Sequence, residues 1–239
     1  SFDILGQHFA SLGLTVNQVS LLPGTDVSLP PFAAALSLLE QQDIDPASGL
    51  DEEDSSDPAA TAKAEEAADA AKRDVLGEME ITARIMITGG DAREDARMTR
   101  ADRLLIRKAI LSAARSVLDA GRAQVITMDV STALRTLAAE EEGQRRERGK
   151  EMADGLELFC DGLSGHFFNR PGIPWPEVDV TIVNMGIFAR EGYQDLLSVA
   201  YIGLMNNIVN LAERCQYDGR HLIALTDEAH IITTNPLLA

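Results

Sequence analysis

The feature of this sequence that most constrains its fold is a central stretch, from Thr61 to about Leu163, in which apolar residues recur every three or four positions. This spacing gives each of several helices one narrow apolar face. Because such faces can be buried only against one another, the stretch is predicted to form a helical bundle. The clearest stripes are Leu76, Met79, Ala83 and Met86, then Ile106, Ile110, Ala113 and Val117, and then Met152, Leu156, Phe159 and Leu163.

Breakers and caps mark the helix boundaries in this bundle. Gly89-Gly90 is expected to end the first helix, and Thr99 followed by Asp102 is a capping pattern for the second. Ser131 is expected to cap the next helix. The charged run from Glu140 to Lys150 is interpreted as a solvated helix face or loop.

The segment before the bundle alternates between helix and strand signals. Residues Phe2 to Leu12 keep helical spacing, Leu14 to Leu22 is β-rich, and a helix is expected from Ala33 to Gln41 after a proline-rich turn. Between Glu40 and Pro58 every charge is acidic, without the glycine-turned spacing of a calcium loop. This run is therefore interpreted as a solvated linker.

The segment after the bundle returns to the same alternation. Val178 to Asn184 is β-branched and strand-like, and a helical stripe of Leu204, Ile208, Leu211 and Cys215 follows. His221 to Thr226 is predicted to be a short strand buried on both faces of a parallel sheet. Strand, long helix and strand together form one right-handed crossover unit.

The predicted fold class is therefore α/β, a partial parallel sheet interrupted by an all-helical insertion subdomain. The expected parts are residues 1–42 in the first part of the α/β domain, 43–60 in the acidic linker, 61–170 in the insertion and 171–239 in the second part. The first residues are Ser1-Phe2 without an initiator methionine, so we expect the chain to be a piece of a longer protein.

Charge and composition exclude several classes of function. The chain has 38 acidic and 21 basic residues, which give a net charge of −17. This charge repels a phosphate backbone, so no tight nucleic-acid binding is expected. Cys160 and Cys215 have no cysteine or histidine at ligand spacing, which excludes a zinc site and a disulfide framework. No apolar run approaches the ~18 residues of a membrane span, and a cytoplasmic location is expected.

One dense group of residues with potentially catalytic side chains lies at the end of the last predicted strand. Asp227 and Glu228 follow the apolar run directly, and His230 comes two residues later. Adjacent carboxylates at a strand end suit nucleoside-triphosphate hydrolysis, in which one holds the Mg²⁺ shell and the other faces the attacking water. His230 is placed to contact the γ-phosphate or the base. The competing interpretation is a helix cap or two surface acids.

The phosphate-binding loop that such a site needs is missing from this sequence. No Gly-x-x-x-x-Gly-Lys-[Ser/Thr] pattern occurs, so this chain alone is expected to bind ATP weakly or not at all. Three weaker candidates are not expected to be catalytic. His8 is interpreted as a surface residue and His166 as a helix-terminal contact, and Ser164 lacks the sequence context of a nucleophile. Six arginines are candidates for reaching a neighbouring subunit's phosphate, although the default interpretation of each is an exposed charge on a helix. They are Arg100, Arg103, Arg107, Arg145, Arg146 and Arg148.

Several segments together carry a resemblance to a known family. They are Ser1-Phe-Asp-Ile-Leu-Gly-Gln-His-Phe9, Ser28-Leu-Pro-Pro-Phe32, Ile87-Thr-Gly-Gly90, Thr99-Arg-Ala-Asp102, and Thr226-Asp-Glu-Ala-His-Ile-Ile-Thr-Thr-Asn-Pro236. The chain resembles the conjugative-transfer ATPases of type IV secretion systems, in the version carried by integrative conjugative elements of proteobacteria. The resemblance spans nearly the whole chain and is most specific at its two ends.

The resemblance implies a RecA-like motor domain split by a helical subdomain, with the phosphate-binding loop before Ser1. It implies ATP and Mg²⁺ as cofactors, Asp227 on the Mg²⁺ side through water, and Glu228 as the catalytic carboxylate. It also implies a hexamer at the cytoplasmic face of the inner membrane, with inner-membrane secretion and coupling proteins as partners. Where the family often has an Asn-Pro-Phe turn, this chain has Leu29-Pro-Pro-Phe32, which leaves the asparagine's role without a counterpart.

Two other functions remain open at this point. The sequence Asp-Glu-Ala-His matches a helicase box, but at least 226 residues precede Asp227 without a phosphate-binding loop, which disfavours a helicase fragment. The second is a non-catalytic module, in which the helical bundle docks secretion-channel partners and the acidic pair is structural.

Overall fold

The computed structural model describes residues 2–39, 74–173, 175–188, 190–217, 219 and 221–227. The described elements are α1 (Phe2–Ser11), β1 (Val16–Ser20), the 3-10 helix η1 (Ala33–Leu36), α4 (Val75–Thr88), α5 (Ala92–Ala96), α6 (Arg100–Asp119), α7 (Thr127–Glu140), α8 (Gly143–Glu157), α9 (Gly162–Phe168), β2 (Val180–Asn184) and α10 (Gln194–Tyr217). Helices therefore dominate, and the sheet in the described part of the chain has two strands.

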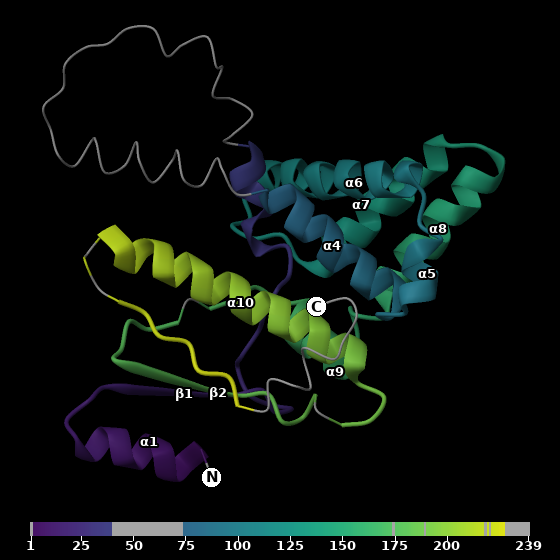
Figure 1. Cartoon of the computed structure of the whole chain (residues 1–239). Helices are drawn as coiled ribbons and strands as arrows, with labels where there is room; N and C mark the ends of the chain where they lie inside the picture. The colour runs from purple at the N-terminus through teal and green to yellow at the C-terminus, as the bar shows by residue number, and fades with distance from the viewer. Residues whose placement is uncertain are drawn as a thin grey trace, which may run out of the picture.

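β1 and β2 pair in parallel, although the whole helical stretch separates them in sequence. Val16 lies opposite Val180 and Ser20 opposite Asn184. At the start of the pair, the Thr15 backbone N–H and Oγ1 donate to Asp179 Oδ2 at 2.8 and 2.7 Å, a contact between residues 164 positions apart. The predicted parallel layer with a helical insertion is confirmed at this coarse level (Figure 1).

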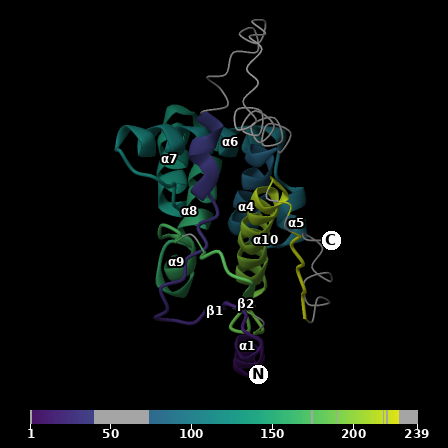
Figure 2. The ribbon, with the colours of Figure 1, turned by 90° about the vertical axis from the view of Figure 1, so that its left-hand side faces the viewer.

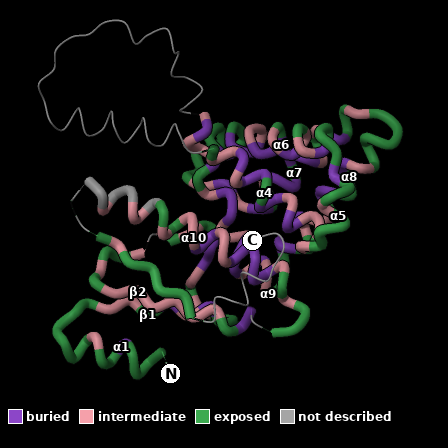
Figure 3. Tube along the Cα trace, viewed as in Figure 1, coloured by how far each residue is buried: buried purple, intermediate pink, exposed green. Residues whose placement is uncertain are grey.

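The predicted apolar stripes form the core of the inserted helices. Met79, Ile106, Ile110 and Leu156 are all buried, and Figure 3 shows burial concentrated in this half of the molecule. Gly89 ends α4 with a φ of 59°, a left-handed conformation that favours glycine. The predicted capping box is present as well, since Thr99 Oγ1 accepts from the Asp102 N–H while Asp102 accepts from the Thr99 N–H.

One predicted cap is wrong. α7 begins at Thr127, one residue after Ile126, so Ser131 lies inside the helix rather than at its start. The Ser131 side chain is buried and donates to the Ala153 carbonyl of α8 at 3.2 Å. At the actual start of α7, Asn169 Oδ1 accepts from the Met128 N–H at 2.9 Å, and Asp129 Oδ2 accepts from the Ile126 N–H at 2.9 Å.

An aromatic cluster joins the inserted helices α4 to α9, which we call the helical body, to the sheet. Phe167 at the end of α9 meets Phe188, after β2, edge to face at 5.3 Å between ring centroids. Both rings are fully buried, as is Phe32 beside η1. Ser28 Oγ ties the N-terminal segment to the same place by donating to the carbonyls of Phe167 at 2.9 Å and Arg170 at 2.8 Å.

The structure corrects the prediction for residues 221–226. They form no strand, and Ile223 and Leu225 are 82 % and 93 % exposed. A strand is held by a ladder of backbone hydrogen bonds, and the described part of the sheet pairs only β1 with β2. The helix predicted from Ala33 to Gln41 begins as the 3-10 helix η1, and the acidic linker 43–60 lies outside the described residues.

A partly buried ion cluster holds α4, α5 and α6 together. Arg84 of α4 donates to both carboxylate oxygens of Asp95, at 2.9 and 2.5 Å. Glu80, one turn before Arg84, pairs with Arg107 of α6, and its side chain is only 7 % exposed. Glu80 also lies 3.8 Å from Arg84, so one carboxylate with little access to water faces two arginines.

Glu80→Gln is therefore expected to lower the free energy of unfolding by about 1–3 kcal/mol, since the amide keeps the shape but removes the charge that Arg107 faces. The measurement is urea unfolding followed by circular dichroism. Glu147→Gln is the control, because Glu147 pairs with Lys150 at 2.9 Å but is 66 % exposed, and a change within about 0.5 kcal/mol is expected there. Equal losses in both variants would contradict a special role for the buried cluster.

A second ion cluster gives a pH dependence. Arg135 of α7 donates to Glu157 of α8 at 2.7 and 2.8 Å, and this contact lowers the pKa of Glu157 from its ordinary value of 4.5. A carboxyl group with a lowered pKa stabilises the fold above its unfolded pKa, and this contribution is lost as the pH falls through the folded one. The difference in stability between the wild type and Arg135→Met should therefore shrink below about pH 4.5. A difference that stays constant from neutral to acid pH would contradict this.

Candidate functional site

The structure places only part of the predicted catalytic group. Asp227 is an exposed residue in a turn after the extended segment 221–226, and Glu228 and His230 lie outside the described residues. Of the predicted pair of acids, the described residues therefore include only the one on the Mg²⁺ side. Asp227 makes its own interactions and is not free.

The course of the chain before Asp227 agrees with the predicted crossover in direction. After α10, the segment 221–227 turns back and runs in the same direction as β1 and β2, and it ends level with their carboxyl ends (Figures 1 and 2). The order is therefore strand, helix and extended segment, where strand, helix and strand was predicted. What the structure lacks is the hydrogen-bonded ladder that would make this segment a third strand.

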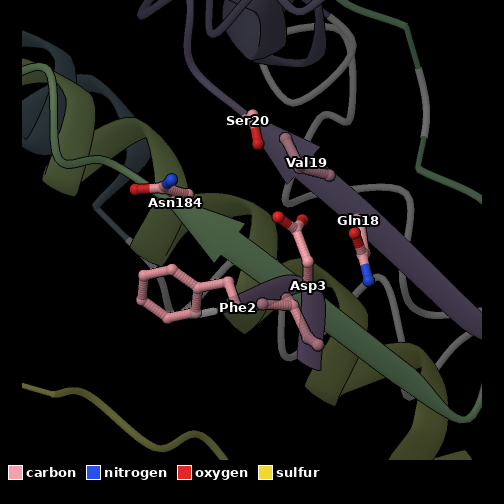
Figure 4. A pocket seen from close by; sticks show the side chains of 7 residues that line it. Phe2, Asp3, Gln18, Val19, Ser20 and Asn184 are labelled. Carbon is pink, nitrogen blue, oxygen red and sulfur yellow. The ribbon is translucent and has the colours of Figure 1, made fainter. Parts of the chain in front are cut away.

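A cavity of about 280 Å³ opens at the carboxyl ends of the two strands. Its lining residues are Phe2, Asp3, Gln18, Val19, Ser20, Ile182 and Asn184. Phe2 and Asp3 come from the start of α1, and the others come from β1 and β2 (Figure 4). The carboxyl edge of a parallel sheet is where α/β folds bind ligands.

The polar side chains of this cavity lie close to the backbone of neighbouring elements. The Gln18 amide packs against α1 at Gly6, where an added Cβ would lie 1.6 Å from Nε2 and the Gln18 side chain would have to move. Asn184 Oδ1 accepts from the Gly186 N–H at 3.0 Å, which orients the amide at the end of β2. In Figure 4 the Asp3 carboxylate points into the space between the ends of the two strands.

The described lining residues can form hydrogen bonds. They include one carboxylate, two amides and one hydroxyl, and none of these described residues is basic. Among the described residues, no group of three or more histidine, cysteine or acidic side chains is placed to hold a metal ion.

Sequence reasoning missed these residues, although a signal was available. Ser20 and Asn184 each stand at the end of a strand-like run, in the position that drew attention to Asp227. The rule that polar residues at strand ends face a ligand applies equally to all three. What the sequence did not reveal was that α1 brings Asp3 to the same edge.

The weaker candidates take structural roles. His166 Nε2 lies 2.7 Å from the Thr25 carbonyl, and Arg170 Nη1 lies 3.2 Å from His166 Nδ1, so both ring nitrogens are engaged. This agrees with the predicted helix-terminal contact. Ser164 is half-buried in the same helix, and His8 is exposed on α1.

Four of the six candidate arginines are engaged within the helical body. Arg107 pairs with Glu80, Arg145 with Glu141 at 3.4 Å, and Arg148 with Glu151 at 3.3 Å and Asp102 at 3.7 Å. Arg146 donates to the Ala139 carbonyl at 2.7 Å and the Glu141 carbonyl at 2.9 Å, near the end of α7. Arg103 differs, because its Nε is buried without a hydrogen-bond partner among the described residues.

No family model, curated protein or solved structure matches this chain. Within the described residues, no helix combines the length and apolarity that crossing a membrane requires. The functional argument therefore depends on the residues and their arrangement.

The two cysteines should differ in reactivity. Burial raises the pKa of Cys160 to about 12, so its thiol stays protonated, whereas Cys215 is only half-buried on α10. At about pH 8 a thiol reagent should label Cys215 first, and Cys215→Ala should remove the fast phase while Cys160→Ala keeps it. Stopped-flow labelling checks this, and a fast phase lost with Cys160→Ala would contradict it.

Proposed function

We propose that this chain is part of the nucleotide-hydrolysing motor of a conjugative type IV secretion ATPase, the family that its sequence resembles. The observation that carries the proposal is the parallel pairing of β1 with β2 around the inserted helices. A motor domain split by a helical subdomain needs this connectivity, because the two parts of its sheet must find each other across the insertion. The RecA-like character of the domain is part of the proposal.

In this proposal Asp227 holds the Mg²⁺ shell, Glu228 orients or deprotonates the attacking water, and His230 senses the γ-phosphate. The direction of segment 221–227 supports it, since the segment runs with β1 and β2 toward their carboxyl edge (Figure 1). ATP and Mg²⁺ are the proposed cofactors. The proposed partners are further copies in a hexamer, and inner-membrane and coupling proteins at the cytoplasmic face of the inner membrane.

Exposed apolar residues on the thin α/β layer also support the proposal. On α1, Phe2, Ile4 and Leu5 are 43 %, 67 % and 48 % exposed, and Ile223 and Leu225 are more exposed still. Apolar surface of this extent is typical of a face that packs against a partner. We propose that neighbouring strands or subunits of the motor cover it, and that segment 221–226 then joins the sheet.

A non-catalytic docking module is the second candidate, and the helical body favours it. The inserted helices share one continuous core with η1 and the first turns of α10, but they leave Leu104, Leu118 and Leu158 more than half exposed. A docking surface on this body is also compatible with a motor. The two candidates therefore differ in whether removing the catalytic acid abolishes ATP turnover. A helicase fragment remains disfavoured by the absence of a phosphate-binding loop before Asp227.

ATP turnover by the longer protein that carries a phosphate-binding loop tests the motor proposal. Glu228→Gln should lower the rate by about 10²- to 10⁴-fold, as expected for the loss of a general base. Glu191→Gln is the matched control, because Glu191 is an exposed acid between β2 and α10, and its rate should stay unchanged.

An unchanged rate in Glu228→Gln would contradict the assigned role and favour the docking module. The same preparation gives a structural readout by amide hydrogen exchange. If segment 221–226 joins the sheet in the motor, its amides should be protected there and exchange rapidly in the present chain, which has no ladder at this position.

A further inference from the structure

Helix α6 has the opposite charge from the chain as a whole. The chain has a net charge of −17, whereas α6 contains five basic and two acidic side chains. One of the two acids, Asp102, is buried in the capping box, and the other, Asp119, is the last residue of the helix. The solvent-facing side of α6 is therefore basic over most of its length.

Leucines alternate with basic residues along this exposed side. Residues three or four positions apart share one face of a helix. Leu104 and Leu118 are more than half exposed, and Leu111 between them is half-buried. Figure 3 shows exposed and buried stretches alternating along α6, as expected for a helix with one free face. We call this face the α6 stripe, and its members are Arg100, Leu104, Lys108, Leu111, Arg115 and Leu118.

The stability of the helix does not explain the cations of the α6 stripe. Arg100 occupies the first helical position, where a cation faces the positive end of the helix dipole. Within the described residues, the ion pairs of α6 involve Arg107 and Asp102, and none involves Arg100 or Lys108. Arg115 has another interaction of its own. Two exposed cations of the stripe, Arg100 and Lys108, are therefore available to a partner.

The spacing of the leucines favours a helix as that partner. Leu104, Leu111 and Leu118 recur every seven residues, which is the repeat with which two helices pack along each other. At 1.5 Å per residue they extend over about 21 Å, a length that two or three heptads of a partner helix cover.

Charge decides what such a helix carries beside its apolar seam. Glutamate or aspartate there would pair with the stripe's cations, which lie next to the leucines. A nucleic acid or an anionic lipid surface would instead be repelled by the net charge of −17. A second copy in a two-fold contact would bring two sets of the same cations together.

We propose that the α6 stripe binds an acidic amphipathic helix of a partner protein. The apolar residues of the partner pack beside Leu104, Leu111 and Leu118, and its carboxylates pair with Arg100 and Lys108. The proposal gives the docking surface considered above a class of partner. It depends on α6 alone, so it holds whether or not the longer protein hydrolyses ATP.

Fluorescence anisotropy with a labelled synthetic peptide tests the proposal. The peptide has leucine at every seventh position over about three heptads, glutamate on both sides of that seam and alanine elsewhere. It is expected to bind the chain with a Kd on the order of 10–100 μM, and the same peptide with glutamine in place of glutamate about tenfold more weakly. Lys108→Glu and Leu104→Gln should each weaken binding of the glutamate peptide about tenfold.

Arg93→Glu and Leu158→Gln are the matched controls, because each makes the same change at an exposed residue outside α6, and binding should stay unchanged. Far-UV circular dichroism verifies that each variant is folded. No binding of the glutamate peptide, or equal losses in the stripe and control variants, would overturn the proposal.

Two further measurements identify the other possible occupants of the stripe. Binding to phosphatidylserine vesicles that Lys108→Glu abolishes, without peptide binding, would overturn the proposal in favour of a membrane surface. Self-association in sedimentation that Leu104→Gln abolishes, without peptide binding, would overturn it in favour of an interface between copies. None of these outcomes alters the turnover expected from Glu228→Gln.

Discussion

The parallel pairing of β1 with β2 is the interaction on which the rest of the structure depends. Parallel strands need a crossover connection, and here the connection contains the whole helical body. The reciprocal bonds between Thr15 and Asp179 fix where the pairing begins, and Leu21, which donates to the Asn184 carbonyl at 3.1 Å, extends it by one residue. Without this register, the residues at the carboxyl edge would not meet.

The helical body is attached to this layer firmly enough to orient it. Phe167, Phe168 and Phe188 pack in contact around the junction, and Ser28 bonds carbonyls at the end of α9. The contrast in Figure 3 between the buried helices and the exposed lower layer has a physical basis. The helices α4 and α6 to α9 can bury their apolar faces against one another, whereas two strands with α1 and α10 have too little surface to cover themselves.

The parts of the fold that follow from periodicity could be predicted from the sequence. The stripe ending at Met86, the stop at Gly89 and the capping box at Thr99 all depend on neighbours within one or two turns, and the structure has each of them. The β-rich runs predicted at 14–22 and 178–184 contain the strands observed at 16–20 and 180–184. Ser131 was misplaced because α7 begins at Thr127, where the first turn is bound by Asn169, a residue distant in sequence that accepts from the Met128 N–H.

The remaining differences arise from contacts between distant residues. The composition of residues 221–226 fits a buried strand, but burial needs a ladder partner, and composition does not supply one. The cavity was missed for the same reason, because Asp3 and Asn184 come together only when α1 packs under the paired strands. Of the acids predicted to act on a nucleotide, Asp227 lies within the described residues, and it is exposed in a turn.

The most direct test of this account is a cross-link between the two strands. Asn17 and Thr181 are partners in the parallel register, so cysteines at both positions should form a disulfide on mild oxidation, whereas the pair Asn17 and Val183 should not. Peptide mapping by mass spectrometry identifies the linked positions. Efficient 17–181 linkage with little 17–183 linkage is the predicted result; the reverse preference, or no linkage in either variant, would contradict the parallel layer on which the proposed functions depend.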